Sequence, residues 1–160
     1  MLELISRLRW SAILILAVVL SYRFTDMIWG SFAYPFYLGE NYGALGHTLT
    51  EVGFASKLMG VIATIIGIAI GGLAMLRFGR MPVFFVGAVL AAATNLLFAD
   101  LAIGAIYTDP VLAFLQIDDL FAVFGMDIRM ARLTSVIALE NIAVGLASAA
   151  SVAYLSSIVS

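Results

Sequence analysis

The strongest constraint on the fold is the length of the apolar segments, which alternate with short polar stretches. A helix needs roughly 20 apolar residues to cross the hydrocarbon layer of a membrane. Of the 160 residues, 64% are hydrophobic and 11% are charged, whereas soluble domains carry roughly 25% charged residues. We therefore expect an all-α integral membrane protein that lies in the lipid bilayer as a single domain, 1–160. The expected transmembrane helices are residues 10–38, 52–76, 81–102 and 130–159.

Composition also limits the chemistry of the chain. A net charge of −2 gives no reason to expect a nucleic-acid partner. The sequence has no cysteine, and its single histidine, His47, has no second histidine at metal-ligand spacing, so we expect a solvated loop residue and no metal or cofactor. No phosphate-binding loop, nucleophile elbow or zinc-protease motif is present, and we do not expect an enzyme.

The segments between the apolar stretches predict the topology. Residues 103–129 hold an apolar run of 14 residues, 111–124, which two acids interrupt, so we expect an interfacial helix or a folded external loop. Basic residues near helix ends mark the cytoplasmic side. Two arginines precede the first predicted helix, and two lie in the turn after the second, which predicts that both termini are cytoplasmic. These arginines are Arg7, Arg9, Arg77 and Arg80.

Ionisable residues inside apolar segments cost free energy to place in a membrane, and they are commonly functional. Arg23 and Asp26 are three residues apart and share a helix face. They could form a neutralising ion pair or a pair linked to substrate or protons. Lys57 could extend outward to the membrane surface, or it could point into a cavity and bind an anionic group. Asn95 lies in the middle of the third segment, where we expect a hydrogen bond to a neighbouring helix. Asp100 lies near the end of that segment, where we expect an interfacial position.

The last apolar segment combines polar and small residues. Glu140 and Asn141 stand inside an otherwise apolar run that is rich in alanine, glycine and serine. Small residues let helix backbones approach closely in membranes. One face can therefore line a polar cavity while the other packs tightly. The residues that we expect in helix packing, here and in segment 52–76, are Gly60, Gly67, Gly71, Gly145 and Ala149.

The short basic turn at residues 71–80, GGLAMLRFGR, resembles the loop motif of the major facilitator superfamily, Gly-x-x-x-Asp-Arg-x-Gly-Arg. The positions that match this motif are Gly72, Arg77, Gly79 and Arg80. Leu76 stands at the acidic position, and this departure weakens any charge-relay role for the loop.

Four further stretches are similar, in this order and spacing, to the AmpG-type muropeptide permeases. They are YRFTD at 22–26, EVGFASKLMGVIATIIG at 51–67, ATNLLFA at 93–99 and LENIAVGLASAASVAYLSS at 139–157. The resemblance is to the first four helices of the C-terminal half of these transporters. It implies proton-driven import of anhydro-muropeptides across the bacterial inner membrane for peptidoglycan recycling.

The resemblance also suggests roles for individual residues. Arg23 or Lys57 could bind the carboxylates of a muropeptide, and Asp26 or Glu140 could carry the proton. Because such sites form between two halves of a transporter, four helices alone should not transport. The end of the chain directly after an apolar helix likewise favours a fragment that needs the missing helices or another chain supplying them. The alternative is a stand-alone four-helix membrane protein with a structural or interaction role.

Overall fold

The computed structural model describes residues 27–159, and within that range every regular element is a helix. A first helix covers residues 27–38. The remaining elements are α2 (Leu49–Gly53), the π-helical turn η1 (Phe54–Met59), α3 (Gly60–Phe78), α4 (Arg80–Ala102), α5 (Thr108–Phe114), α6 (Ile117–Val123) and α7 (Ile128–Val159).

The helices α2, η1 and α3 form one continuous rod, Leu49–Phe78. It begins at a capping box, in which the Thr48 hydroxyl accepts a hydrogen bond from the Glu51 amide at 3.3 Å. In return, the Glu51 carboxylate accepts one from the Thr48 amide at 2.9 Å. These two bonds satisfy amide groups that have no partner inside the helix. The rod therefore begins three residues before the predicted start at residue 52.

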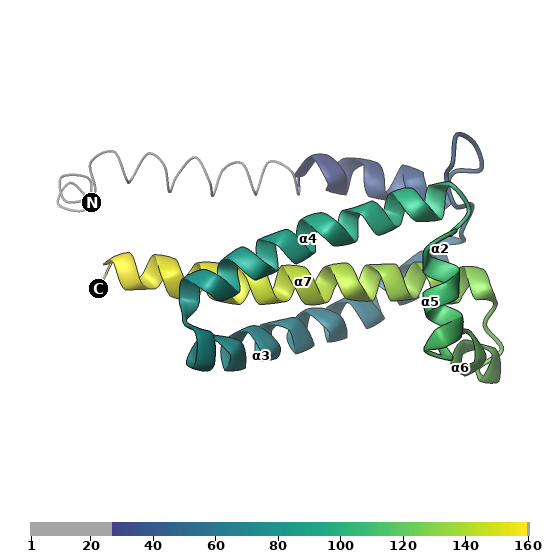
Figure 1. The fold of residues 1–160 in the computed structure, drawn as a ribbon. Helices are drawn as coiled ribbons and strands as arrows, with labels where there is room; N and C mark the ends of the chain where they lie inside the picture. Colours follow the sequence, from purple (N-terminus) through teal and green to yellow (C-terminus); the bar gives the residue numbers. More distant parts are fainter. Residues whose placement is uncertain (1–26, 160) are drawn as a thin grey trace.

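Helix α7 is the centre of the bundle. Helices α3 and α4 each pack along it, whereas they contact each other little. Figure 1 shows α7 between these two helices, with the short turn that joins them near the C-terminal end of α7. The loops 39–48 and 103–127 lie at the opposite end of the bundle.

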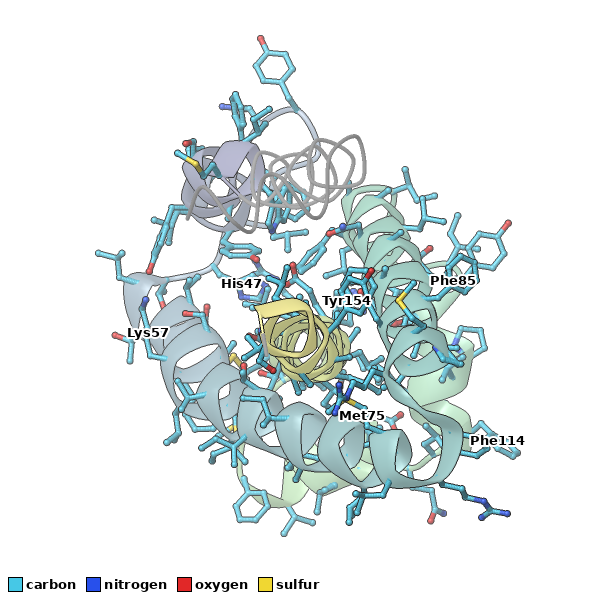
Figure 2. All side chains as sticks on the ribbon, turned by 90° about the vertical axis from the view of Figure 1, so that its left-hand side faces the viewer. His47, Lys57, Met75, Phe85, Phe114 and Tyr154 are labelled. Atoms are coloured by element: carbon cyan, nitrogen blue, oxygen red, sulfur yellow. The ribbon has the colours of Figure 1, made fainter. Side chains whose placement is uncertain are left out.

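Three helices of the described residues are long and apolar enough to cross a membrane: Leu49–Phe78, Arg80–Ala102 and Ile128–Ser156. Their outer faces carry large exposed apolar side chains, such as Ile65 and Phe85. Seen along the bundle, Phe85 points away from α7, whereas Met75 lies between α3 and α7 (Figure 2). Such faces suit lipid rather than water, and the chain is a multi-pass membrane protein. Most of the first predicted span, 10–38, lies outside the described residues.

The loop end of the bundle holds the larger apolar core. Trp29 and Tyr37 of the first helix pack on Phe98 of α4, with ring centroids 5.0 and 6.1 Å from that ring. Leu133 and Ile137 of α7 are fully buried in the same cluster. The first helix is therefore held against α4 by aromatic packing and against α7 by aliphatic side chains of the same cluster.

Residues 103–127 fold into the two short helices α5 and α6, beside the start of α7. Neither helix is long enough to span a membrane. Gln116 separates them in a left-handed conformation, φ 54°, which ends α5 and turns the chain. The predicted segment 103–129 therefore contains two short helices joined by a left-handed residue.

Candidate functional site

Helices α3 and α7 cross at a point built from glycine. A Cβ atom on Gly145 would lie 2.5 Å from the carbonyl oxygen of Thr64 and 3.2 Å from the Cα of Gly67. A Cβ on Gly67 would overlap the carbonyl group of Ile142. One turn further along α3, a Cβ on Gly71 would lie 3.5 Å from the Cβ of Ala149. Backbone therefore meets backbone at this crossing, and no larger residue fits at its centre.

Helix α4 reaches α7 in a similar way at a residue that the sequence analysis did not single out. A Cβ on Gly87 would lie 2.8 Å from the Cα of Ala147. Gly87 has no second glycine at GxxxG spacing, but Ala91 follows it by four residues, and this small-xxx-small spacing is the signal in the sequence for the contact. The two glycine contacts hold α7 tightly on two sides.

A polar cluster lies beside the glycine crossing. The Thr64 hydroxyl donates a hydrogen bond to the Asn141 side-chain oxygen at 3.0 Å. The Asn141 amide nitrogen donates to the carbonyl of Ile137, one turn earlier in α7, at 2.8 Å. Gly60 faces this amide, and a Cβ there would lie 3.3 Å from the nitrogen. Asn141 thus links α7 to α3 at a place where a glycine makes room for it.

Glu140 faces a different neighbour. Successive residues of a helix point about 100° apart, and Glu140 acts electrostatically on the Tyr37 hydroxyl of the first helix. The Glu140 side chain is half-buried. Asn141 therefore presents its amide to α3, while the charge of Glu140 acts on the first helix at Tyr37. Arg23 and Asp26, the other predicted members of this site, lie outside the described residues.

The structure places Lys57 and Asn95 on exposed faces. A regular helical wheel predicts Lys57 beside the small-residue stripe of α3, but the wider π-helical turn η1 rotates it away. Figure 2 shows Lys57 on the outer side of the helices, away from α7. Asn95 makes no side-chain hydrogen bond to any residue between 27 and 156, so the expected bond to a neighbouring helix is not seen there.

A second set of polar contacts orders the loop end. The buried Asp100 carboxylate, expected only at the interface, accepts hydrogen bonds from the Thr108 amide at 2.7 Å and hydroxyl at 2.6 Å. It also accepts one from the Tyr107 amide at 3.1 Å. These bonds fix the start of α5 against the end of α4. A carboxylate followed by a threonine eight residues later is too common a pattern to predict this contact.

Arginines at the start of α7 tie the loops to the bundle. Arg132 forms a two-bond ion pair with Asp109, Nε to Oδ1 at 2.7 Å and Nη2 to Oδ2 at 2.5 Å. Arg129 donates to the carbonyls of Leu45 and Gly46 at 2.6 and 3.0 Å. Both arginines therefore have structural partners in the loops at this end of the bundle.

The expectation of a solvated His47 is wrong. Its side chain is buried, and Nδ1 lies 3.1 Å from a carboxylate oxygen of Glu51. The capping box holds Glu51 beside the imidazole, and Figure 2 shows His47 on the inner side of the helices. Across residues 27–156, no cluster of acidic or histidine side chains is arranged to hold a metal ion.

The basic turn between α3 and α4 contains Arg77, Gly79 and Arg80, all exposed. Gly79 has φ +82°, a conformation that side chains other than glycine rarely adopt, and it reverses the chain in a single residue. Gly72 lies in α3, and a Cβ atom added there would meet nothing within 4 Å outside its own helix backbone. Three of the four residues that match the family loop motif thus form this turn.

Comparison with known proteins gives one kind of match. The chain is 32% identical over 87 residues to the Rickettsia conorii protein named "Putative transporter AmpG 4", which covers 54% of this chain and 20% of that protein. The protein of the same name from Rickettsia felis is 31% identical over 87 residues, with the same coverage. The chain is therefore similar to part of an AmpG transporter. It matches only about a fifth of the length of these relatives.

No family model matches the sequence, and no solved structure matches it. The similarity to the two transporters agrees with the resemblance found in the sequence motifs. It gives no support to an enzyme and points to a transporter-like membrane protein.

Proposed function

We propose that this chain forms part of a proton-coupled secondary transporter that imports anhydro-muropeptides for cell-wall recycling. The observation that carries the proposal is the pair Glu140 and Asn141 on the central helix of a chain similar to AmpG transporters. Ionisable side chains inside a membrane bundle commonly serve a function. The surrounding glycines supply the close packing that such a bundle needs.

The candidate roles follow from charge. Muropeptides carry carboxylates, which Lys57 or Arg23 would bind, and Glu140 or Asp26 would accept the proton. Lys57 is exposed on the described bundle, which suits a residue that faces further transporter helices. Transporter sites lie between two halves, so the proposal requires further helices, either in a longer polypeptide or from another chain.

The proposed location is the bacterial inner membrane with both termini in the cytoplasm. Arg77 and Arg80 lie at the end of the bundle where α7 ends, and the acids Glu40, Asp109 and Asp119 lie in the loops at the other end. Basic residues near helix ends mark the cytoplasmic side. The turn 77–80 is then cytoplasmic, and α5 and α6 lie in the periplasm.

An exchange experiment tests the proposal. Residues 1–160 of this chain replace the region of the Rickettsia conorii relative that contains the 87 aligned residues, and labelled anhydro-muropeptide uptake is measured in cells without their own permease. We expect uptake above the empty-vector level that an uncoupler of the proton gradient abolishes. If the parent relative transports and a membrane-inserted exchange protein does not, this chain does not supply a working transport segment.

The second candidate is a stand-alone membrane subunit with a structural or interaction role. The glycine contacts of α7 with α3 and α4 favour this subunit as much as they favour a transporter segment, because they stabilise any small bundle. An exchange protein that inserts without transporting, together with stable insertion of the chain alone, would favour this subunit.

A further inference from the structure

The end of the bundle near the basic turn contains an apolar cavity. It has a volume of about 320 Å³ and lies between α3, α4 and α7. The cavity exists because α3 and α4 both pack on α7 but contact each other little. All the residues that line it are apolar: Ala74, Phe78, Pro82, Val83, Val86 and Leu146.

Two cations stand beside this cavity. The guanidinium of Arg77 lies over the ring of Phe78, 5.4 Å from its centroid, and Phe78 itself lines the cavity. Arg80 begins α4, two residues before the cavity residue Pro82. Both arginines are exposed, and within residues 27–156 neither forms an ion pair. The family motif has an acid at the position of Leu76, so the carboxylate that would partner an arginine here is missing.

We propose that this cavity binds an anionic phospholipid, with an acyl chain against the apolar lining and the phosphate between Arg77 and Arg80. Helices that cross a bilayer bring the turn 77–80 to the headgroup level and the cavity just below it. A basic site between transmembrane helices at this level suits an anionic headgroup. The proposal needs only a membrane-spanning bundle and does not depend on the proposed transport.

Charge is the reason to choose an anionic lipid over another occupant. A transmembrane helix or a zwitterionic lipid would also cover an apolar cavity, but neither supplies a net negative charge to two unpaired guanidinium groups. A soluble phosphate would meet the arginines but would leave the apolar lining uncovered. An anionic lipid satisfies both parts of the site at once.

Native mass spectrometry of the purified chain in detergent tests the site. Phosphatidylglycerol and phosphatidylethanolamine with the same acyl chains are titrated, and the lipid-bound fractions are compared. We expect a roughly thirtyfold preference for phosphatidylglycerol, from about 1 kcal/mol for each of the two arginines near an anionic headgroup. In the double variant R77Q/R80Q this preference should disappear, whereas K57Q, which removes an exposed charge elsewhere, should keep it.

A second pair of variants tests the cavity itself. Val86 lines the cavity and Val89 does not, although both valines are about half exposed on α4. Val86→Trp should fill the cavity and reduce phosphatidylglycerol binding several-fold, while Val89→Trp should leave it unchanged. Glycerophosphoglycerol, the headgroup without acyl chains, should not displace the lipid.

Four results would overturn the proposal. Equal binding of the two lipids would remove the role of charge, and an unchanged preference in R77Q/R80Q would place the anion elsewhere. Equal effects of the two tryptophan variants, or displacement by glycerophosphoglycerol, would show that the cavity does not hold the acyl chain.

Discussion

Gly67 of α3 and Gly145 of α7 face each other so closely that a Cβ on Gly145 would lie 3.2 Å from the Cα of Gly67. The crossing of these two helices is therefore set by backbone contact rather than by side-chain interdigitation. It brings Thr64 within hydrogen-bond distance of Asn141. The polar cluster exists because the glycines allow it.

Gly67→Ala should destabilise the bundle, because its methyl group would overlap the carbonyl of Ile142. Overpacking of this kind costs about 1–3 kcal/mol. The matched control is Gly72→Ala in the same helix, where nothing lies within 4 Å of the added atom. That variant should be neutral or stabilising by about 0.5–1 kcal/mol. Thermal unfolding in detergent measures both, and equal losses at the two positions would contradict the glycine crossing.

Thr64 and Asn141 should be energetically coupled. In a double-mutant cycle with Thr64→Val and Asn141→Leu, we expect a coupling free energy of about 0.6 kcal/mol, typical of a hydrogen bond between membrane helices. Denaturation in mixed micelles supplies the four unfolding free energies. Additive losses, with no coupling, would show that the 3.0 Å contact does not stabilise the bundle.

Asp100→Asn should loosen the start of α5. The carboxylate accepts three donors from Tyr107 and Thr108, and an amide in its place would turn a donor toward them. The loss of charged hydrogen bonds predicts a cost of about 1.5–3 kcal/mol. Asp119→Asn, on an exposed face of α6, is the control and should change nothing. Protease cleavage within residues 103–127 reports the effect, and equal cleavage of the two variants would contradict it.

The ion pair of Arg132 with Asp109 should hold α5 against α7. Both side chains are partly exposed, 27% and 39%, so we expect a coupling of about 1 kcal/mol or less. Arg132→Gln and Asp109→Asn should each speed hydrogen exchange in α5. In the double variant, α5 should exchange no faster than in either single variant. A double variant with the sum of both effects would show that the two residues act independently.

The main helices follow from sequence because their signals are long and physical. A long apolar run predicts a spanning helix, and glycines at Gly67 and Gly71 predict a close contact face. The start at Leu49 is also encoded locally, since Thr48 and Glu51 have the spacing of a capping box. The predicted start at residue 52 rests on hydropathy, which does not respond to capping.

Other features depend on contacts that local sequence does not encode. The π-helical turn η1 moves Lys57 to an exposed face, and no residue in FASKLM specifies such a turn. The burial of His47 depends on the fold of the loop around it. The contact of Gly87 with Ala147 depends on where α4 meets α7, a tertiary relation.

The most direct measurement is muropeptide uptake by the exchange protein carrying Glu140→Gln, followed across external pH. Glu40→Gln, which removes an exposed loop carboxylate, is the matched control. If α7 lines a proton-coupled pathway, Glu140→Gln lowers uptake to background or removes its pH dependence, while Glu40→Gln retains both. Unchanged uptake with unchanged pH dependence in Glu140→Gln would contradict a role for Glu140 in transport.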